Sequence, residues 1–246
     1  SNDSVLVKKQ IQETQLINAT EDNESQPQML LERYVSFIRH EQDKGQAIWL
    51  YDLTLQQEFR LTPYTDLIGS YQWLNQNTLL FANMTNQQIE IFRLNIELNN
   101  LKDTKQVIMS TAPIATLTNI NLFRSFFLTP NNHLIYQANI DRQSQLRQYN
   151  LGSGENTILL NESAQFKPYG FSVNTLTQQI AIIGFNEAMT TEVKLLVLSD
   201  NQLQNLTTLD SNIYHIAWQD QQNQLLLTQG KKLINLSLSG EIKEIY

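Results

Sequence analysis

Three histidines are the only imidazole side chains in this chain that could bind a metal or transfer a proton. They are His40, His133 and His215, and they lie far apart in the sequence. A histidine metal site needs its nitrogens to converge to about 2 Å from one ion, and no His-x-His or His-x₃-His pair occurs. Thiolate metal sites, disulfides and cysteine nucleophiles are excluded because the chain has no cysteine. We therefore expect neither a metal nor a cofactor.

Catalytic carboxylates and nucleophilic serines are not indicated either. A glycoside hydrolase needs two carboxylates that face each other, but Asp66, Asp103, Asp141 and Asp210 all lie in segments that read as loops. A serine hydrolase is not indicated because no Gly-x-Ser-x-Gly motif occurs. The sequence predicts no catalytic residue, and we expect a protein that is not an enzyme.

A set of cationic and aromatic side chains is more suited to binding than to catalysis. These side chains lie at the starts of strand-like segments or within them, and they are Arg124, Lys167, Tyr169, Tyr214 and His215. Together they could form a pocket for a small ligand or for a peptide of a partner protein. The alternative is that they line a water-filled channel that has no partner.

Charge and composition limit the partners further. The chain of 246 residues carries 17 Lys and Arg against 24 Asp and Glu, which gives a net charge of −7. Nucleic-acid binding needs basic residues gathered on one face, and no run of four basic residues occurs. We expect this segment to bind no nucleic acid. No apolar stretch reaches the roughly 18 residues of a membrane helix, and the lack of cysteine fits the bacterial periplasm as well as the cytosol.

A degenerate repeat predicts the elements that position these side chains. Each copy reads as an aromatic or bulky strand, a short Asn/Gln turn, an aliphatic strand, a turn and a second aliphatic strand, most clearly in residues 71–94 and 216–236. The third strand of each copy is marked by a leucine, at Leu53, Leu94, Leu151, Leu198 and Leu238. A strand-based repeat of 40 to 57 residues is typical of a β-propeller.

Apolar runs support this interpretation. In a propeller the middle strands of each blade are covered on both faces, and they read as unbroken apolar runs rather than alternating ones. Residues 48–51, 180–183 and 195–198 read in this way. The sequence predicts an all-β propeller of about five four-stranded blades, with six as the alternative count. We expect Trp49, Trp73 and Trp218 to fill gaps between blades rather than to line a binding face.

The N-terminal region differs from the repeats. We expect residues 1–27 to be a linker or edge segment and residues 28–246 to be the propeller domain. Residues 18–28 are polar and acidic and read as a loop. The first copy lacks a turn signal between residues 29 and 37, so either residues 5–17 supply its inner strand or that blade is short. Ser1 and Asn2 look like the remnant of a cleaved tag, and a membrane helix or a further domain is expected to precede them.

Two segments resemble the blades of TolB-like propellers. Residues 127–136 (FLTPNNHLIY) are similar to the family's Trp-Ser-Pro-Asp-Gly-x-x-Ile-Ala-Phe phrase, and residues 48–53 (IWLYDL) are similar to its Ile-Tyr-x-x-Asp-Leu strand. The resemblance covers about residues 28–246, although the Asp-Gly turn is missing throughout. It implies a TolB-like propeller that lies in the bacterial periplasm.

The chain is also similar to the periplasmic portion of ToxR/CadC-like one-component transcription regulators. In these proteins a cytoplasmic DNA-binding domain is followed by one membrane helix and a periplasmic sensor. This resemblance implies a non-enzymatic sensor of an inner-membrane protein that binds a small ligand or a periplasmic protein, with a second copy of the chain as a further expected partner in a homodimer. DNA binding would belong only to the missing N-terminal domain, and the membrane would be reached through a missing upstream helix. The alternatives are a free periplasmic scaffold and a carbohydrate-processing propeller enzyme.

Overall fold

The described part of the chain is built almost entirely from antiparallel β strands. The computed structural model describes residues 23–85, 87–101, 107–110, 112–219 and 223–245. The chain divides into two compact units, Ser1–Thr118 (unit 1) and Asn119–Tyr246 (unit 2). No helix in this part of the chain has the length and hydrophobicity needed to cross a bilayer.

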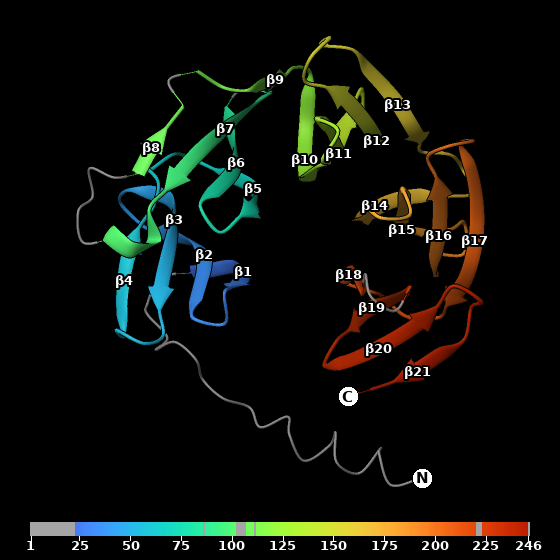
Figure 1. Cartoon of the computed structure of the whole chain (residues 1–246). Helices are drawn as coiled ribbons and strands as arrows, with labels where there is room; N and C mark the ends of the chain where they lie inside the picture. The colour runs from blue at the N-terminus through green and yellow to red at the C-terminus, as the bar shows by residue number, and fades with distance from the viewer. Residues whose placement is uncertain (1–22, 86, 102–106, 111, 220–222, 246) are drawn as a thin grey trace, which may run out of the picture. The chain divides into compact units, whose positions relative to one another are not determined.

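Unit 1 contains two sheets (Figure 1). The first follows the order β1 (Asn23–Leu30), β2 (Tyr34–Glu41), β3 (Gly45–Asp52) and β4 (Gln57–Arg60). The second follows the order β5 (Ile68–Asn75), β6 (Thr78–Thr85), β7 (Gln88–Ile96) and β8 (Val107–Met109). A short 3₁₀ helix, η1 (Leu98–Asn100), follows β7, and β9 (Ala115–Leu117) adds a fifth strand by pairing with β7. The sequence did not predict β9.

Unit 2 contains three sheets of four strands each. The first consists of β10 (Ile120–Leu128), β11 (His133–Ile140), β12 (Gln143–Asn150) and β13 (Asn156–Asn161). The second consists of β14 (Lys167–Asn174), β15 (Gln179–Phe185), β16 (Thr191–Val197) and β17 (Gln202–Leu209). The third consists of β18 (His215–Gln219), β19 (Gln224–Gln229), β20 (Lys232–Ser237) and β21 (Ile242–Glu244).

The five sheets are propeller blades. In each of them four strands follow one another in chain order and pair antiparallel with their neighbours, which is the topology of a propeller blade. The second strands are buried on both faces, as Leu80, Phe81 and Ala82 on β6 and Ile182 and Ile183 on β15 illustrate. The predicted fold class, an all-β propeller with five four-stranded blades, is confirmed.

A backbone hydrogen bond recurs at the end of the third strand in four blades. The residue that ends or directly follows this strand donates its amide to the carbonyl of the residue just before the second strand. The pairs are Leu53 to Arg33, Ile96 to Asn77, Leu151 to Asn132 and Leu198 to Gln178, at 2.8–3.1 Å. The second blade uses Ile96 rather than the predicted Leu94. In these four blades the bond lies at the end where the first and second strands are joined.

The first blade corrects two expectations about residues 18–41. Residues 23–28 form most of β1 instead of a loop. This strand, and not residues 5–17, which lie outside the described residues, is the first strand of a complete four-stranded blade. The turn that the sequence failed to signal is Leu31–Glu32, where both residues have a left-handed backbone (φ 53° each) without the usual Asn or Gly. A polar strand is stable here because β1 pairs with β2 on both sides of an irregularity between Ser25 and Gln28. In addition, the side chains of Gln26 and Gln28 donate to the backbone of the next sheet, to Gly69 O and Tyr71 O at 3.1 Å each.

Two tryptophans join neighbouring sheets, as expected. Trp73 on β5 donates its indole N–H to Ser36 Oγ on β2 at 2.9 Å. Trp218 on β18 donates in the same way to the carbonyl of Ser172 on β14 at 2.9 Å. Trp49 instead faces its own sheet, with its ring 4.8 Å from the Arg39 guanidinium carbon. The bulky side chains of the repeat are therefore used largely for packing.

Candidate functional site

All five predicted binding residues belong to unit 2 and lie on or next to the first strands of its three blades. Arg124 lies on β10, Lys167 and Tyr169 lie on β14, His215 begins β18, and Tyr214 directly precedes it. In a propeller the first strand of a blade is the one that lines the channel. Topology therefore places these residues on corresponding strands, and Lys167 and His215 occupy the same starting position of β14 and β18.

Tyr169 is engaged within the protein. Its hydroxyl donates to the carbonyl of Ile213 at 2.9 Å and lies 3.2 Å from Thr191 Oγ1, and its ring stacks on Phe185 with 4.5 Å between centroids. Burial raises the pKa of Tyr169 above its ordinary value. This side chain fixes the start of β14 against the segment that leads into β18.

Three of the other predicted residues are exposed to solvent. Arg124 is exposed at a β-bulge between Phe123 and Ser125. Lys167 is paired with Glu162 across 3.4 Å, and its side chain is still 58% exposed. His215 is exposed at the beginning of β18. These three side chains expose two positive groups and one ionisable group to solvent, although the net charge of the protein is −7.

Tyr214 borders an open hollow of about 480 Å³, here called the Tyr214 hollow. The residues that line it come from the segment before β18 and from the β19–β20 turn: Ser211, Asn212, Tyr214, Gln229, Gly230, Lys231 and Lys232. Gln229 donates a side-chain hydrogen bond to Ser211, which ties the two walls together. Gly230 has the left-handed backbone of the tight turn predicted there (φ 58°). Tyr214 is 61% exposed, a large value for an aromatic residue.

The three histidines lie in three different sheets, on β2, β11 and β18. Among the described residues, no three His, Asp or Glu side chains come close enough together to hold a metal ion. His133 has its Nε2 3.3 Å from Asn150 Nδ2 at the start of β11. The residues described therefore show no constellation that fits a resident metal.

A second hollow of unit 2, here called the Asn174 hollow, lies at the opposite end of the strands. It has a volume of about 350 Å³ and lies between the β10–β11 and β14–β15 turns. The sequence predicted both turns but not the hollow. Two of its walls come from segments that are 40 residues apart in the sequence, residues 129–133 and 173–178. No local sequence pattern reports such an approach.

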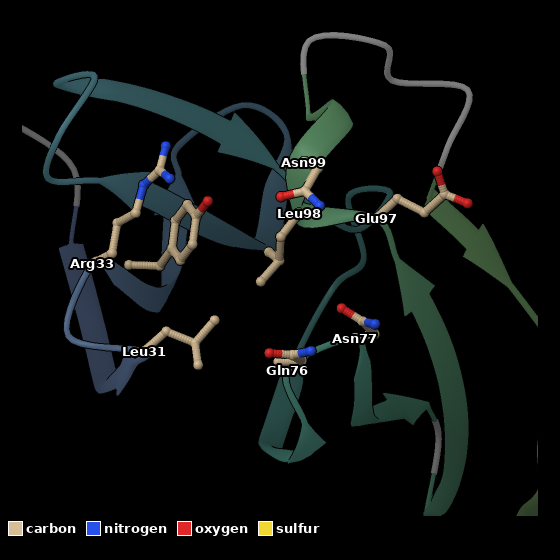
Figure 2. Close-up of a pocket in the computed structure, with 8 residues that line it drawn as sticks. Leu31, Arg33, Gln76, Asn77, Glu97, Leu98 and Asn99 are labelled. Carbon is tan, nitrogen blue, oxygen red and sulfur yellow. The ribbon is translucent and has the colours of Figure 1, made fainter.

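Unit 1 has a hollow in the corresponding position, between its β1–β2 and β5–β6 turns. It has a volume of about 370 Å³, and Figure 2 shows Leu31 and Leu98 on opposite sides of it, with Gln76 and Asn77 along one edge. The Arg33 guanidinium, also on its wall, binds the Asp52 carboxylate through two hydrogen bonds of 3.1 and 2.7 Å. None of these residues was predicted from the sequence to bind a ligand.

Asp52 is the aspartate of the TolB-like segment, and its role is structural. Its side chain is 1% exposed, and Oδ1 also accepts the amides of Thr54 and Leu55 at 2.8 and 3.1 Å. The hydrogen bonds from Arg33 lower the pKa of Asp52, and the two backbone amides act in the same direction. The carboxylate thus closes the turn from β3 to β4 and fixes Arg33 at the edge of the hollow.

Acid is expected to weaken unit 1 through Asp52. Because the pKa of Asp52 is lower in the folded chain, its contribution to stability is complete above the unfolded pKa of about 3.9 and is lost as the pH falls through the folded value. Asp52→Asn should lower the free energy of unfolding by about 1–2 kcal/mol at neutral pH and reduce its loss in acid. Urea denaturation at several pH values measures both effects. The exposed Asp66→Asn serves as the control, and an equal acid response in both variants would contradict the assignment.

Comparisons with known proteins show the fold but no family. No protein-family model matches the chain, and no curated protein sequence matches it. Many solved structures do match. TolB from Acinetobacter baumannii is 17% identical with a TM-score of 0.65, over 92% of this chain and 54% of TolB. A putative TolB from Agrobacterium tumefaciens is 9% identical with a TM-score of 0.66, over 92% of this chain and 82% of the other.

The propeller domain of the Trilobed protease from Pyrococcus furiosus is similar as well. It is 14% identical with a TM-score of 0.60, over 90% of this chain and 68% of the other. At these identities the likeness concerns the fold alone, and the chain spans about half the length of the Acinetobacter TolB. The predicted TolB-like propeller fold is confirmed. TolB proteins and a protease share this fold, so the fold by itself does not assign an activity.

Proposed function

We propose that this chain is a non-enzymatic interaction and sensor domain that binds a segment of a partner protein at the Tyr214 hollow. The observation that carries the proposal is the exposure of Tyr214 beside an open, shallow hollow. Tyrosine is enriched at protein interfaces, where its ring supplies contact area and its hydroxyl a hydrogen bond. A hollow that is open to solvent fits a peptide segment better than a small substrate, which is usually enclosed.

The charges around the hollow favour an acidic partner. Lys231 and Lys232 form its rim, and Lys232 pairs with Glu244 across 3.0 Å while remaining more than half exposed. His215 is adjacent to Tyr214 in the chain and is also exposed. Opposite charge across a rim steers association and orients the partner. We infer that the bound segment carries Asp or Glu beside an apolar residue that packs on the tyrosine ring.

The perturbed ionisable groups support binding rather than catalysis. Active sites usually hold groups with strongly shifted pKa values. In the described part of the chain the shifted groups belong to ion pairs of unit 1 or to buried tyrosines, and each shift follows from burial or from a hydrogen-bonded partner. None of these groups lines the Tyr214 hollow. This distribution fits a protein whose ionisable groups stabilise the fold.

We place the domain in the periplasm, as the sensor of a membrane-anchored transcription regulator. The support is the TolB-like fold together with the resemblance of the sequence to such sensors. The encoded sequence upstream of Asp3 tests this placement directly. An apolar stretch of about 20 residues preceded by a DNA-binding domain is the expected result. A native N-terminus with a cleavable signal peptide and no such stretch would contradict the anchor and favour a free periplasmic scaffold.

Photo-crosslinking tests the binding site itself. Replacing Tyr214 with p-benzoylphenylalanine in the full chain should give a covalent adduct of defined mass in living cells. The same residue at position 176 is the matched control, because Leu176 is 77% exposed and lies in the β14–β15 turn of the same unit. Lys231→Glu should reduce the yield at position 214 by about threefold, since one rim charge contributes up to about 1 kcal/mol.

The identity of the adduct decides the outcome. Mass spectrometry should locate the crosslink on an acidic segment of one partner protein. Equal yields at positions 214 and 176, or a yield that is unchanged by Lys231→Glu, would contradict the proposal. A crosslink to a second copy of this chain would instead identify the hollow as a homodimer interface, and would overturn the assignment to a different partner protein.

A further inference from the structure

Three turns of unit 2 share one pattern of hydrogen bonds. They span residues 129–133, 186–190 and 237–241, and they join β10 to β11, β15 to β16 and β20 to β21. In each turn the first residue donates its amide to the carbonyl of the fifth, and the fourth donates to the carbonyl of the first, at 2.9–3.1 Å. The side chain of the first residue also accepts the amide of the fifth. This is the three-residue hairpin loop, in which the last loop residue has a left-handed backbone.

Met189 is an unusual residue for the left-handed position of such a turn. The corresponding residues of the other two turns are Asn132 (φ 59°) and Gly240 (φ 87°), and both types adopt this backbone readily. Met189 has the same backbone (φ 59°), although its Cβ disfavours it. Its side chain is 68% exposed, so burial within the fold does not offset this strain. A strained residue that the fold does not require is a candidate for function.

The turn holds Met189 in a fixed position. Asn186 accepts the amide of Met189 through its backbone carbonyl and the amide of Thr190 through Oδ1, at 3.0 Å each. Its Nδ2 donates to Glu192 Oε1 at 3.2 Å, and Glu192 also pairs with Lys194 at 3.0 Å. Because the backbone of the turn is already ordered, little of its freedom is lost when a partner binds. The flexible thioether can still adapt to the surface of that partner.

Tyr169 links this turn to the Tyr214 hollow. Its hydroxyl donates to the carbonyl of Ile213 at 2.9 Å and lies 3.2 Å from Thr191 Oγ1. Ile213 directly precedes Tyr214, and Thr191 lies two residues after Met189. One hydroxyl group therefore joins the two segments that carry the exposed side chains. Both segments lie at the end of unit 2 where β14 and β18 begin, so one partner segment can reach both.

The charge beside Met189 is opposite to that of the lysines on the rim of the Tyr214 hollow. Glu187 is exposed in the same turn, and its carboxylate accepts a hydrogen bond of 3.4 Å from the side-chain amide of Gln165. Two neighbouring ion pairs are each neutral, Lys167 with Glu162 and Lys194 with Glu192. A segment that spans both places therefore meets a negative charge at one end and positive charges at the other. Such an arrangement fixes the direction in which the segment binds.

We propose that Met189 is a second anchor of the partner-binding surface, so that the partner segment carries two apolar side chains, one that packs on Tyr214 and one that packs on Met189. This inference rests on the proposed binding at the Tyr214 hollow and extends it. The segment carries Asp or Glu beside its first apolar residue and Lys or Arg beside its second. Tyr169 is a positioning residue that keeps the two anchors together.

A substitution that removes the anchor and relieves the backbone separates binding from stability. Met189→Asn introduces the residue type of the 129–133 turn. It should raise the melting temperature by about 2–4 °C. It should also lower the yield of the photo-crosslink at position 214 by about fivefold or more, because an apolar contact is lost. Asn132→Met is the matched control, since it changes the same position of the same turn at the opposite end of the strands. It should lower the melting temperature by a similar amount and leave the yield unchanged.

Crosslinking from the turn itself tests the contact directly. With p-benzoylphenylalanine at position 189 of the full chain, living cells should give an adduct with the same protein that position 214 captures. Mass spectrometry should locate the new crosslink on the same segment, beside Lys or Arg. The probe at position 132 should give no such adduct. Glu187→Lys should reduce the yield at position 189 by about threefold, the effect of one exposed charge.

The results distinguish this inference from the proposed function. An adduct at position 214 without one at position 189, or a yield at 214 that Met189→Asn leaves unchanged, would overturn the second anchor and leave the Tyr214 site in place. Different proteins captured at the two positions would have the same meaning. No adduct at position 214 would overturn both proposals, and so would a crosslink to a second copy of this chain at both positions. If the probe at position 189 prevents folding, as a melting curve would show, the yield at 214 in Met189→Asn decides.

Discussion

Replacing Gly45 with alanine is expected to lower the free energy of unfolding of unit 1 by about 3 kcal/mol or more. Gly45 begins β3 with a left-handed backbone (φ 92°), which disfavours any residue with a Cβ. A Cβ there would also lie 2.4 Å from the carbonyl oxygen of Thr65. That oxygen accepts the amide of Gln46 at 2.7 Å, and Thr65 donates back to Gln46 at 2.9 Å. The clash is with backbone, so it can be relieved only by breaking this bridge.

Gly230→Ala separates the loss of stability caused by the left-handed backbone from the loss caused by the steric clash. Gly230 is also left-handed (φ 58°), but nothing lies within 4 Å of the position its Cβ would occupy. Its alanine variant should therefore lose only the backbone term of about 1–2 kcal/mol. Urea denaturation followed by circular dichroism gives both free energies. Equal losses at the two positions would show that the bridge between Gln46 and Thr65 contributes nothing.

Arg39→Met is expected to destabilise unit 1 by about 3 kcal/mol. The Arg39 guanidinium is almost fully buried and donates to both oxygens of Glu58 at 2.8 Å and to Glu24 at 3.0 Å. It also lies 5.1 Å from the ring of Phe37 and 4.8 Å from that of Trp49. The bonds with Glu58 raise the pKa of Arg39, and those with Glu24 act in the same direction, so the group stays charged. Its removal takes the cation away from the partly buried carboxylate of Glu58, which Arg39 binds through both oxygens.

Two further variants test this explanation. Arg39→Met combined with Glu58→Gln should recover part of the loss, because the second change removes the Glu58 charge that has lost its arginine partner. Lys232→Met breaks the exposed pair with Glu244, in which both side chains are more than half exposed, and should change stability by less than about 0.5 kcal/mol. A loss from Lys232→Met as large as that from Arg39→Met would show that burial of the pair is not what matters.

The Arg39 cluster also shows how β1 is held in the first blade. Glu24 lies on β1, Arg39 on β2 and Glu58 on β4, so one guanidinium connects the first strand of the blade with the last. Tyr71 of the next sheet adds a hydrogen bond of 2.7 Å to the carbonyl of Gln26, and burial raises the pKa of Tyr71. Through these contacts a strand with few apolar side chains becomes part of the fold.

The architecture could be predicted from the sequence because each blade forms from strands that are neighbours in the chain. A strand of about eight residues, a turn and another strand pair as neighbours in the chain, so each blade is recorded in a short stretch of apolar runs and turn residues. The run 180–183 therefore predicted β15, and the pair Gln229–Gly230 predicted the β19–β20 turn. The prediction from local sequence was wrong for β1, whose polar residues read as a loop. The side chains of this strand bind Arg39 of the next strand and the backbone of another sheet, and these contacts leave no pattern in the local sequence.

The candidate sites were decided by contacts between segments that are distant in the sequence. Tyr214, Lys167 and His215 were predicted to bind a partner because their side chains are aromatic or cationic. The sequence did not show that Tyr169 is engaged in packing. Nor did it show that Lys231 and Lys232 border the hollow beside Tyr214. Met189 could be read only as a residue between two predicted strands. Its place beside Tyr214 follows from the two contacts of the Tyr169 hydroxyl, because exposure and hydrogen bonding are set by what the rest of the chain places around a residue.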